Sequence, residues 1–522
     1  MVATQEERDD HDLAKFGYKQ ELVRTLGSFS TFAIGFAFIS ILTGMFELFA
    51  FAYGSGGPAS WWAWMIAVGG QLLFALAFAE LAVQYPLAGS VYNWAKNISR
   101  RGTAWMAGAS LTLALVVSTA AVALAWQFVL PSISSVFWIY GNGSGPYDAA
   151  TNGVILGTIM IVGTTIVSLL GTKVIKIVNN IGVTVELIAV ALLVVFFLIH
   201  TRRGPGVIMQ TNGTGSAYHI GYLGALLVAV LLGLYIMWGF DTAGSVGEET
   251  VNPRKTNPPA IIRALLASGI GGALLLITAF MAIGNLKAPE LSTVGLPYVV
   301  KSVLGTFLGD TLLVCAAIAI FVCCLANQTG AVRMIFAMAR DNGLPGSHKL
   351  SRISERDKTP VIPVVGVAVI SIVILLINIR QPQVVVVVTS DTVILALIAY
   401  VLVVGPFALL RMRGKWTRPE KGYFSLGRAG LAVSAAAFIW GVAMIVDIAW
   451  PRRGVYNPVA PFHWWLQWGR DPVPRDLPGD PVPPVLVLAA SQDGHPGGAC
   501  IGCALRRSTE PRRGVTAEAV AP

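Results

Sequence analysis

The sequence predicts an all-α integral membrane protein. Of the 522 residues, 55% are hydrophobic and only 12% are charged, whereas a soluble chain would carry roughly 25% charged residues. The apolar residues form successive runs of about 20, the length of a helix that crosses the bilayer core. The polar N-terminus, residues 1–27, has no short apolar core before a cleavage site, so we expect a cytoplasmic tail rather than a removable signal peptide.

Eleven apolar runs are long enough to cross the membrane. We expect the spans, each within three residues, near 28–52, 61–84, 104–130, 153–171, 177–199, 221–247, 264–284, 311–331, 361–379, 384–410 and 428–450. Residues 28–410 would form a ten-span transport core, and 428–450 an eleventh span.

The positive charges indicate the orientation. With the N-terminus in the cytoplasm, the inside loops hold 20 Lys and Arg and the outside loops hold 5. Such an asymmetry places the basic loops in the cytoplasm. The net charge of +10 is therefore mainly a topology signal, and nucleic acid is not an expected partner.

The cysteines predict neither a disulfide framework nor a metal site. Three of the five lie inside apolar runs, and Cys500 and Cys503 form a lone C-x-x-C without a second ligand pair. No metal and no cofactor are expected.

Two predicted spans contain features that break helices. Gly44 lies in the middle of the first span, and Gly244 lies in the sixth, which also carries Asp241. Glycine permits the backbone angles of an unwound turn, and paired interruptions in two halves of a membrane protein are typical of a transporter's binding site. The alternative is that these glycines only allow close helix packing.

A helix broken at membrane depth presents two kinds of polar end. Its exposed N–H groups favour an anion such as a carboxylate, and its exposed carbonyl groups favour an ammonium group. Two breaks side by side would therefore suit a zwitterion.

Three motifs carry a family resemblance: "ELAVQYPLAGSVYNWA" at 80–95, "GFDTAGSVGEETVNPRK" at 239–255 and "RMIFAMARDNGLP" at 333–345. Over about residues 20–469 the chain resembles the amino acid–polyamine–organocation permeases, in their amino acid/choline transporter branch. The resemblance implies a LeuT-like fold of five-plus-five inverted repeats, with broken helices 1 and 6 and two further spans.

The resemblance also implies a binding site between the two broken helices. N–H groups at 43–45 would receive a substrate carboxylate, and the carbonyl groups of Ser40, Tyr235 and Trp238 would receive its amino group. The candidate binding residues are Ser40, Ile41, Thr43, Gly44, Met45, Tyr235, Trp238, Phe240, Asp241, Thr242 and Gly244.

Two intramembrane carboxylates are candidates for proton coupling. Asp241 occupies a position that is gating or proton-linked in relatives, so it would contact an amino headgroup, carry a proton, or both. The bland alternative is an Asp bonded to nearby backbone N–H groups. Glu186 stands where some proton-coupled relatives have a lysine in place of a sodium ion. We expect proton coupling, with a sodium site left open and a purely structural Glu186 as the alternative.

Ion pairs are expected at the cytoplasmic end. Glu248 and Glu249 are gate candidates, with Arg333 or Arg340 as their partners.

The C-terminal segment departs from the family pattern. Residues 451–469 would be an interfacial remnant, and residues 470–522, rich in proline and lacking Phe, Trp, Tyr and Lys, would form a disordered tail. A frameshift or truncation near Gly469 would explain why a twelfth span is missing.

The predicted function is secondary active transport of an amino acid or related small amine across the plasma (cell inner) membrane, by alternating access. Amino acids, γ-aminobutyrate, choline and polyamines all fit. The alternative is a non-transporting sensor or a defective pseudo-permease. An enzyme is not expected, because no nucleophile elbow, metal spacing or P-loop is present.

Overall fold

The computed structural model describes residues 26–456, apart from 219, 355–358, 382 and 451, and also residues 9, 13, 14, 16 and 24. The chain separates into two units, Met1–Trp468 and Gly469–Pro522, and every described residue belongs to the first. Of the expected remnant at 451–469, only residues 452–456 are described, and the expected tail at 470–522 lies outside the described residues.

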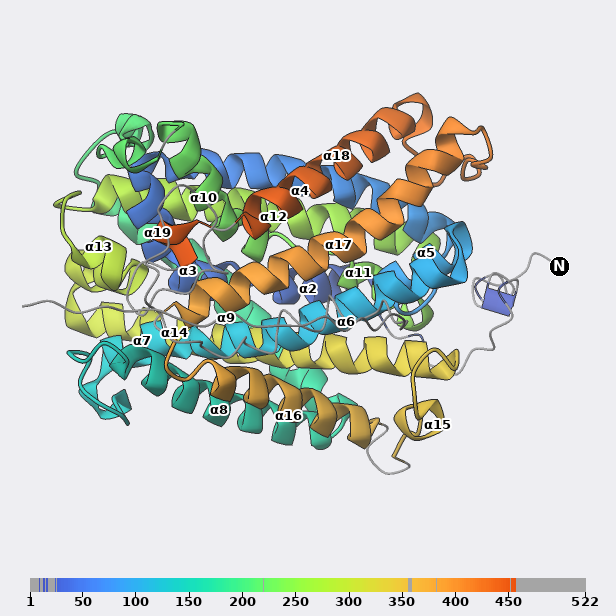
Figure 1. Cartoon of the computed structure of the whole chain (residues 1–522), viewed down its shortest axis with the longest axis horizontal. Coiled ribbons are helices and arrows are strands. Elements are labelled where there is room, and N and C mark those ends of the chain that lie inside the picture. Colours follow the sequence, from blue (N-terminus) through green and yellow to red (C-terminus); the bar gives the residue numbers. More distant parts are fainter. Residues whose placement is uncertain are drawn as a thin grey trace, which may run out of the picture. The chain divides into compact units, whose positions relative to one another are not determined.

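The described part is built from helices, which confirms the all-α membrane class (Figure 1). The helices are α2 (Ser28–Ile39), α3 (Ile41–Gly56), α4 (Trp61–Gln84), α5 (Ser90–Ile98), α6 (Arg101–Leu124), α7 (Trp126–Ile133), α8 (Asp148–Leu169), α9 (Thr172–Ile199), α10 (Tyr222–Ile236), α11 (Thr242–Ser245), α12 (Pro253–Ala282), α13 (Glu290–Thr293), α14 (Leu296–Arg340), α15 (Ser347–Leu350), α16 (Val361–Ile377), α17 (Val384–Met412), α18 (Gly430–Ala449) and α19 (Arg453–Tyr456).

Helices occupy all eleven predicted spans. By length and hydropathy, 8 helical stretches of the described chain can cross a membrane, or 9 with one bent pair. The first stretch, Ser28–Gln84, has 57 residues, far more than the roughly 20 that one crossing needs. It contains α2, α3 and α4, and the chain turns between the last two at Gly57, whose φ is 61°.

Two helices extend well beyond the predicted bounds. α12 begins at Pro253 rather than near 264, because its first turns are polar and do not register in a hydropathy pattern. α14 begins at Leu296 rather than near 311, but a non-helical Gly305 (φ 74°) divides it into a short first part and the long span.

The two broken spans run in opposite directions. Leu26, just before α2, pairs with Thr250, just after the sixth span. At the other end, the Tyr222 hydroxyl at the start of α10 donates to the Gly56 carbonyl at the end of α3, at 2.9 Å. This antiparallel pairing is the one that inverted repeats require.

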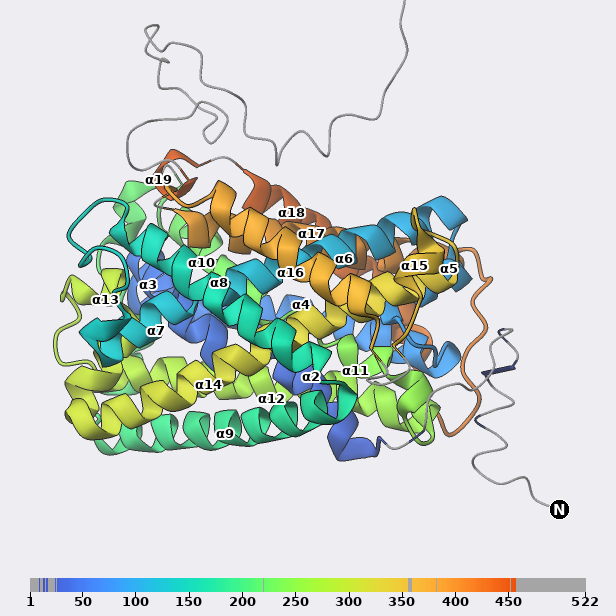
Figure 2. The ribbon, with the colours of Figure 1, turned by 90° about the horizontal axis from the view of Figure 1, so that it is seen from below.

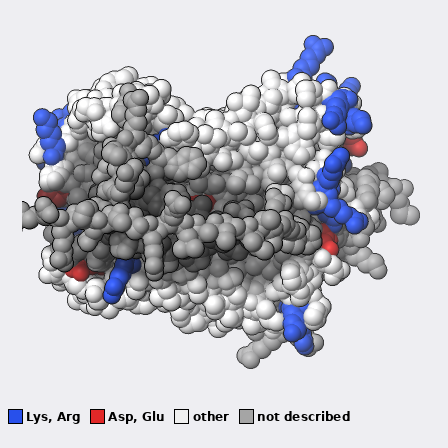
Figure 3. Space-filling model, viewed as in Figure 1, with Lys and Arg blue, Asp and Glu red and all other residues white. Residues whose placement is uncertain are grey.

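The outer helices present apolar side chains at their surface. α8, α9, α12 and α14 run side by side (Figure 2), and large apolar side chains on α8 and α9 are more than half exposed, among them Ile159, Ile166, Ile181 and Ile188. Lys and Arg gather at the two ends of the helices, and the described surface between them is largely uncharged (Figure 3). This distribution fits a protein whose middle faces lipid.

A buried carboxylate holds the loop between α17 and α18 in place. Glu80 on α4 is fully buried and pairs with Arg411. It also accepts hydrogen bonds from Trp416 Nε1 at 3.0 Å and from the backbone N–H of Leu426 at 3.1 Å. Because every partner belongs to the end of α17 or to the following loop, Glu80 ties that loop to α4.

Replacing Glu80 should destabilise the protein. In Glu80→Ala, Arg411 would stay buried without its counter-charge, which costs about 3–5 kcal/mol. We expect a clearly lower melting temperature for the detergent-solubilised protein. The control is Glu420→Ala, since Glu420 is 74% exposed and 3.9 Å from Arg254, a contact worth little. An equal effect of the two substitutions would contradict this role of Glu80.

Candidate functional site

The first break lies at Ser40, between α2 and α3. Ser40 is buried and has φ 33° and ψ 92°, a strained conformation for a residue with a side chain. The sequence interpretation placed the interruption at Gly44, which instead lies within α3. A Cβ at Gly44 would be 2.1 Å from Ile236 Cγ1. Gly44 therefore lets α3 and α10 approach closely, and the packing alternative holds for this residue.

The second break covers Met237 to Asp241, between α10 and α11. Gly239 has φ 79° and donates its N–H to the Tyr400 hydroxyl at 2.9 Å. Within the described chain, the backbone carbonyl groups of Tyr235 and Trp238 accept no hydrogen bond. This break thus presents unpaired acceptors, as expected from the sequence. Gly244 lies in α11, after the break, where a Cβ would meet the Trp94 ring at 2.8 Å.

Glu186 caps the first turn of α3. Its Oε1 accepts a hydrogen bond from Ser40 Oγ at 2.9 Å and one from the backbone N–H of Leu42 at 3.2 Å. Ser40 Oγ is also 2.6 Å from Thr43 Oγ1. The exposed helix end that was predicted to receive a substrate carboxylate therefore already faces a carboxylate of the protein.

Asp241 turns away from the first break. Its Oδ2 accepts a hydrogen bond from Ser90 Oγ at 2.7 Å, and its Oδ1 accepts one from the Tyr400 hydroxyl at 2.6 Å. Tyr400 in turn holds Gly239, so Asp241, Tyr400 and Gly239 form one hydrogen-bonded chain. Asp241 is bonded to hydroxyl groups of α5 and α17, rather than to the backbone N–H groups of the bland alternative.

A small cavity lies between the two breaks. Its volume is about 10 Å³, which is space for about one water molecule. Five predicted residues line it: Ser40, Thr43, Gly44, Tyr235 and Trp238. Six others do not line it in this conformation: Ile41, Met45, Phe240, Asp241, Thr242 and Gly244.

The sequence interpretation missed several cavity residues. Ser118 on α6 and Cys323 and Asn327 on α14 also line the cavity. Asn327 Oδ1 is buried with no hydrogen-bond partner among the described residues. An Asn within the apolar run of the eighth span was the available signal for this residue.

A second pair of buried polar groups lies beside the cavity. The carboxyl oxygens of Glu47 and the Tyr235 hydroxyl make no hydrogen bond of normal geometry in the described part of the chain, although the two side chains are close enough to interact with each other. Unpaired buried polar atoms are costly, and they commonly mark a ligand site or ordered water.

Ion pairs connect the end of the sixth span to the end of α14. Arg340 Nη2 is 3.4 Å from Glu248 Oε1, and Arg333 Nη2 is 3.6 Å from Glu249 Oε1. Glu248 also accepts the backbone N–H of Ala88 at 3.1 Å. The expected contacts are present, and their role as a gate stays a prediction.

Comparison with known proteins identifies the family. A family model described as "Amino acid permease" matches residues 26–468. Amino-acid permease BAT1 of Arabidopsis thaliana is 27% identical, over 86% of this chain and 91% of that protein. Its homolog from Oryza sativa subsp. japonica is 29% identical, over 84% and 87%. Branched-chain amino acid permease BcaP of Bacillus subtilis is 27% identical, over 66% and 72%. The chain therefore belongs to the amino acid permease family, within the permease superfamily that its motifs resemble.

Proposed function

We propose that this protein is a proton-coupled secondary transporter of an amino acid or a related small amine in the plasma membrane, with its N-terminus in the cytoplasm. The observation that carries the proposal is the contact of Glu186 with Ser40 and Leu42 at the end of α3. It lies at the cavity between the breaks, where unpaired carbonyl groups and a helix N-terminus come together.

Substrate and proton would be coupled through competition for one helix end. The N-terminus of α3 stabilises one negative charge well, and ionised Glu186 supplies it. A substrate carboxylate that approaches Thr43 meets this charge, and two carboxylates in one site repel each other. Protonation of Glu186 would remove the repulsion and release the Leu42 N–H. Proton and substrate would then bind together, each raising the affinity for the other.

The surroundings of Glu186 support this role. The contacting groups are the Ser40 hydroxyl and the Leu42 N–H, with the Cys323 thiol of α14 near enough to interact electrostatically. None of these described neighbours is a lysine or an arginine, so no basic side chain among them holds the carboxylate ionised.

Asp241 has a positioning role in this proposal. Its bonds to Ser90 and Tyr400 fix the second break through the Gly239 N–H. The carbonyl groups of Tyr235 and Trp238 are then held toward the cavity, ready for an ammonium group, with the buried Glu47 carboxyl group as a further acceptor nearby.

Glu186→Gln should uncouple transport from protons. Glutamine can still accept from Ser40 and Leu42 but cannot titrate, so we expect uptake that no longer responds to an imposed proton gradient. The measurement is uptake of radiolabelled amino acids into proteoliposomes. Leucine is the first probe, because one relative is named a branched-chain permease and Val122 and Ile236 are among the cavity walls.

The matched control for this experiment is Asp241→Asn. It should slow uptake, because it disturbs the Tyr400 bond, while the response to the gradient remains. If Asp241→Asn abolishes that response and Glu186→Gln keeps it, the coupling belongs to Asp241. The same assay tests the alternative function, since a sensor or a pseudo-permease would show no uptake of any amino acid in the panel.

Breaking the ion pairs at the end of α14 should open the cavity to the cytoplasm. Cys323 lines the cavity and is 2% exposed. In a protein whose four other cysteines are serine, we expect Arg340→Gln to raise the labelling rate of Cys323 about tenfold, for a gate worth about 1.4 kcal/mol. A membrane-impermeant thiol reagent is applied from the cytoplasmic side. The control is Lys349→Gln, which alters an exposed lysine in α15, soon after the end of α14. It should leave the labelling rate unchanged, and equal labelling rates in the two variants would contradict the gate.

A further inference from the structure

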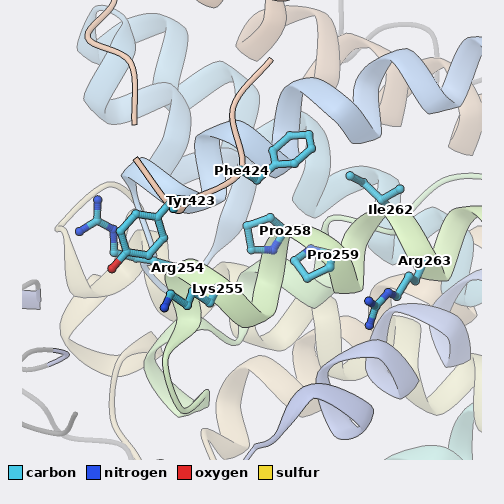
Figure 4. A pocket seen from close by; sticks show the side chains of 9 residues that line it. Arg254, Lys255, Pro258, Pro259, Ile262, Arg263, Tyr423 and Phe424 are labelled. Carbon is cyan, nitrogen blue, oxygen red and sulfur yellow. The ribbon is translucent and has the colours of Figure 1, made fainter. Parts of the chain in front are cut away.

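A second cavity in the described part of the chain lies at the start of α12 and shares no lining residue with the cavity between the two breaks. Its volume is about 330 Å³. One wall is the first three turns of α12, and the other is the loop between α17 and α18 (Figure 4). The lining residues are Arg254, Lys255, Pro258, Pro259, Ile262, Arg263, Gly422, Tyr423 and Phe424. We call it the basic cavity.

Three cationic side chains line the basic cavity, and two of them lie near the ring of Tyr423. The Arg254 guanidinium lies 4.3 Å from the centre of the Tyr423 ring, and its Nε donates to the Val83 carbonyl at 3.1 Å. Lys255 Nζ lies 5.8 Å from the centre of the same ring. Glu420 approaches Arg254 only to 3.9 Å and is 74% exposed. The lining thus holds three cations and no carboxylate, with the exposed Glu420 only near Arg254, which favours an anionic ligand.

An apolar stripe continues from the basic cavity along α12. Lys255, Pro259 and Arg263 are four residues apart and share one face of the helix. Leu266, Ile270 and Leu274 continue that face and are 37%, 60% and 47% exposed. Together they form a surface that is cationic at one end and apolar beyond it. A small soluble anion would use only the first part, whereas an amphiphile would use both.

Hydrogen bonds within the protein hold the walls of the basic cavity in place before any ligand binds. The loop that carries Tyr423 is held by Glu80 through the Leu426 N–H at 3.1 Å, and by the bond from Gln84 Nε2 to the Thr417 carbonyl at 2.8 Å. A preformed site loses less ordering entropy when a ligand binds.

We propose that the basic cavity binds the headgroup of an anionic phospholipid from the leaflet on the Lys- and Arg-rich side, with an acyl chain lying along Leu266, Ile270 and Leu274. The phosphate lies among Arg254, Lys255 and Arg263, and it competes with Glu420 for Arg254. The stripe selects a lipid over free phosphate, and the excess of cations selects an anionic lipid over a zwitterionic one. This site is independent of the transport site and of its coupling ion.

Native mass spectrometry of the full-length protein with phosphatidylglycerol tests the proposal. In Lys255→Gln/Arg263→Gln we expect binding to weaken by about fivefold for each cation removed. The matched control is Lys173→Gln/Lys176→Gln, two exposed cations at the start of α9, which should bind like the unaltered protein. Equal losses in the two double variants would overturn the site.

Two further binding measurements should show an increase in affinity and no change in affinity, respectively. Glu420→Gln should strengthen phosphatidylglycerol binding, by about twofold, because a competing exposed carboxylate is removed. Phosphatidylcholine should bind equally to all variants. Weaker binding in Glu420→Gln would contradict the proposal, as would displacement of the lipid by an equal concentration of inorganic phosphate, which would indicate a free-anion site.

Discussion

A helix end exposed halfway across a membrane has to be paired, because no water is available there to satisfy it. The rest of this structure depends on how that requirement is met. At the first break the pairing group is Glu186, which accepts from Ser40 and Leu42. At the second it is the Tyr400 hydroxyl, which accepts from Gly239 and donates to Asp241. Only the first of these two pairings lies at the cavity, so it is there that the proposed coupling has a substrate compete with the protein for a helix end.

Close packing joins the two broken helices to each other. The missing Cβ atoms of Gly44 and Gly239 make room for Ile236 and for the Phe38 ring, and a Cβ at Gly239 would lie 1.9 Å from that ring. The two broken helices therefore interlock, because each carries a glycine that makes room for an apolar side chain of the other. In the proposed transport cycle the two broken helices would move together. The ion pairs of Glu248 and Glu249 with α14 would then break, because they join this pair of helices to α14.

The sequence predicts the membrane-spanning helices better than it predicts the residues of the candidate site. Hydropathy predicts the spans because lipid imposes one length and one composition on all of them. The sequence predicts the breaks in the correct helices, but it points to Gly44 as the unwound residue, whereas Ser40 has the unusual backbone angles. A glycine that supplies clearance and a glycine that supplies a positive φ look the same in a sequence.

Partners that are distant in the chain were the hardest to predict. Asp241 and Glu186 stand out as carboxylates in apolar runs. Their hydrogen bonds come from Tyr400 and from Ser40, which are 159 and 146 residues away. Nothing local in the sequence records such a pairing. The basic cavity was missed for the same reason, because its second wall follows α17.

Proton uptake on substrate binding tests the central claim most directly. Calorimetric titration of the purified protein with leucine, in buffers of different ionisation enthalpy at one neutral pH, gives the number of protons bound with each ligand. Competition at the end of α3 predicts that the protein takes up close to one proton, and that Glu186→Gln takes up none. Leucine binding without any proton uptake in the unaltered protein, or equal uptake in the variant, would contradict the account.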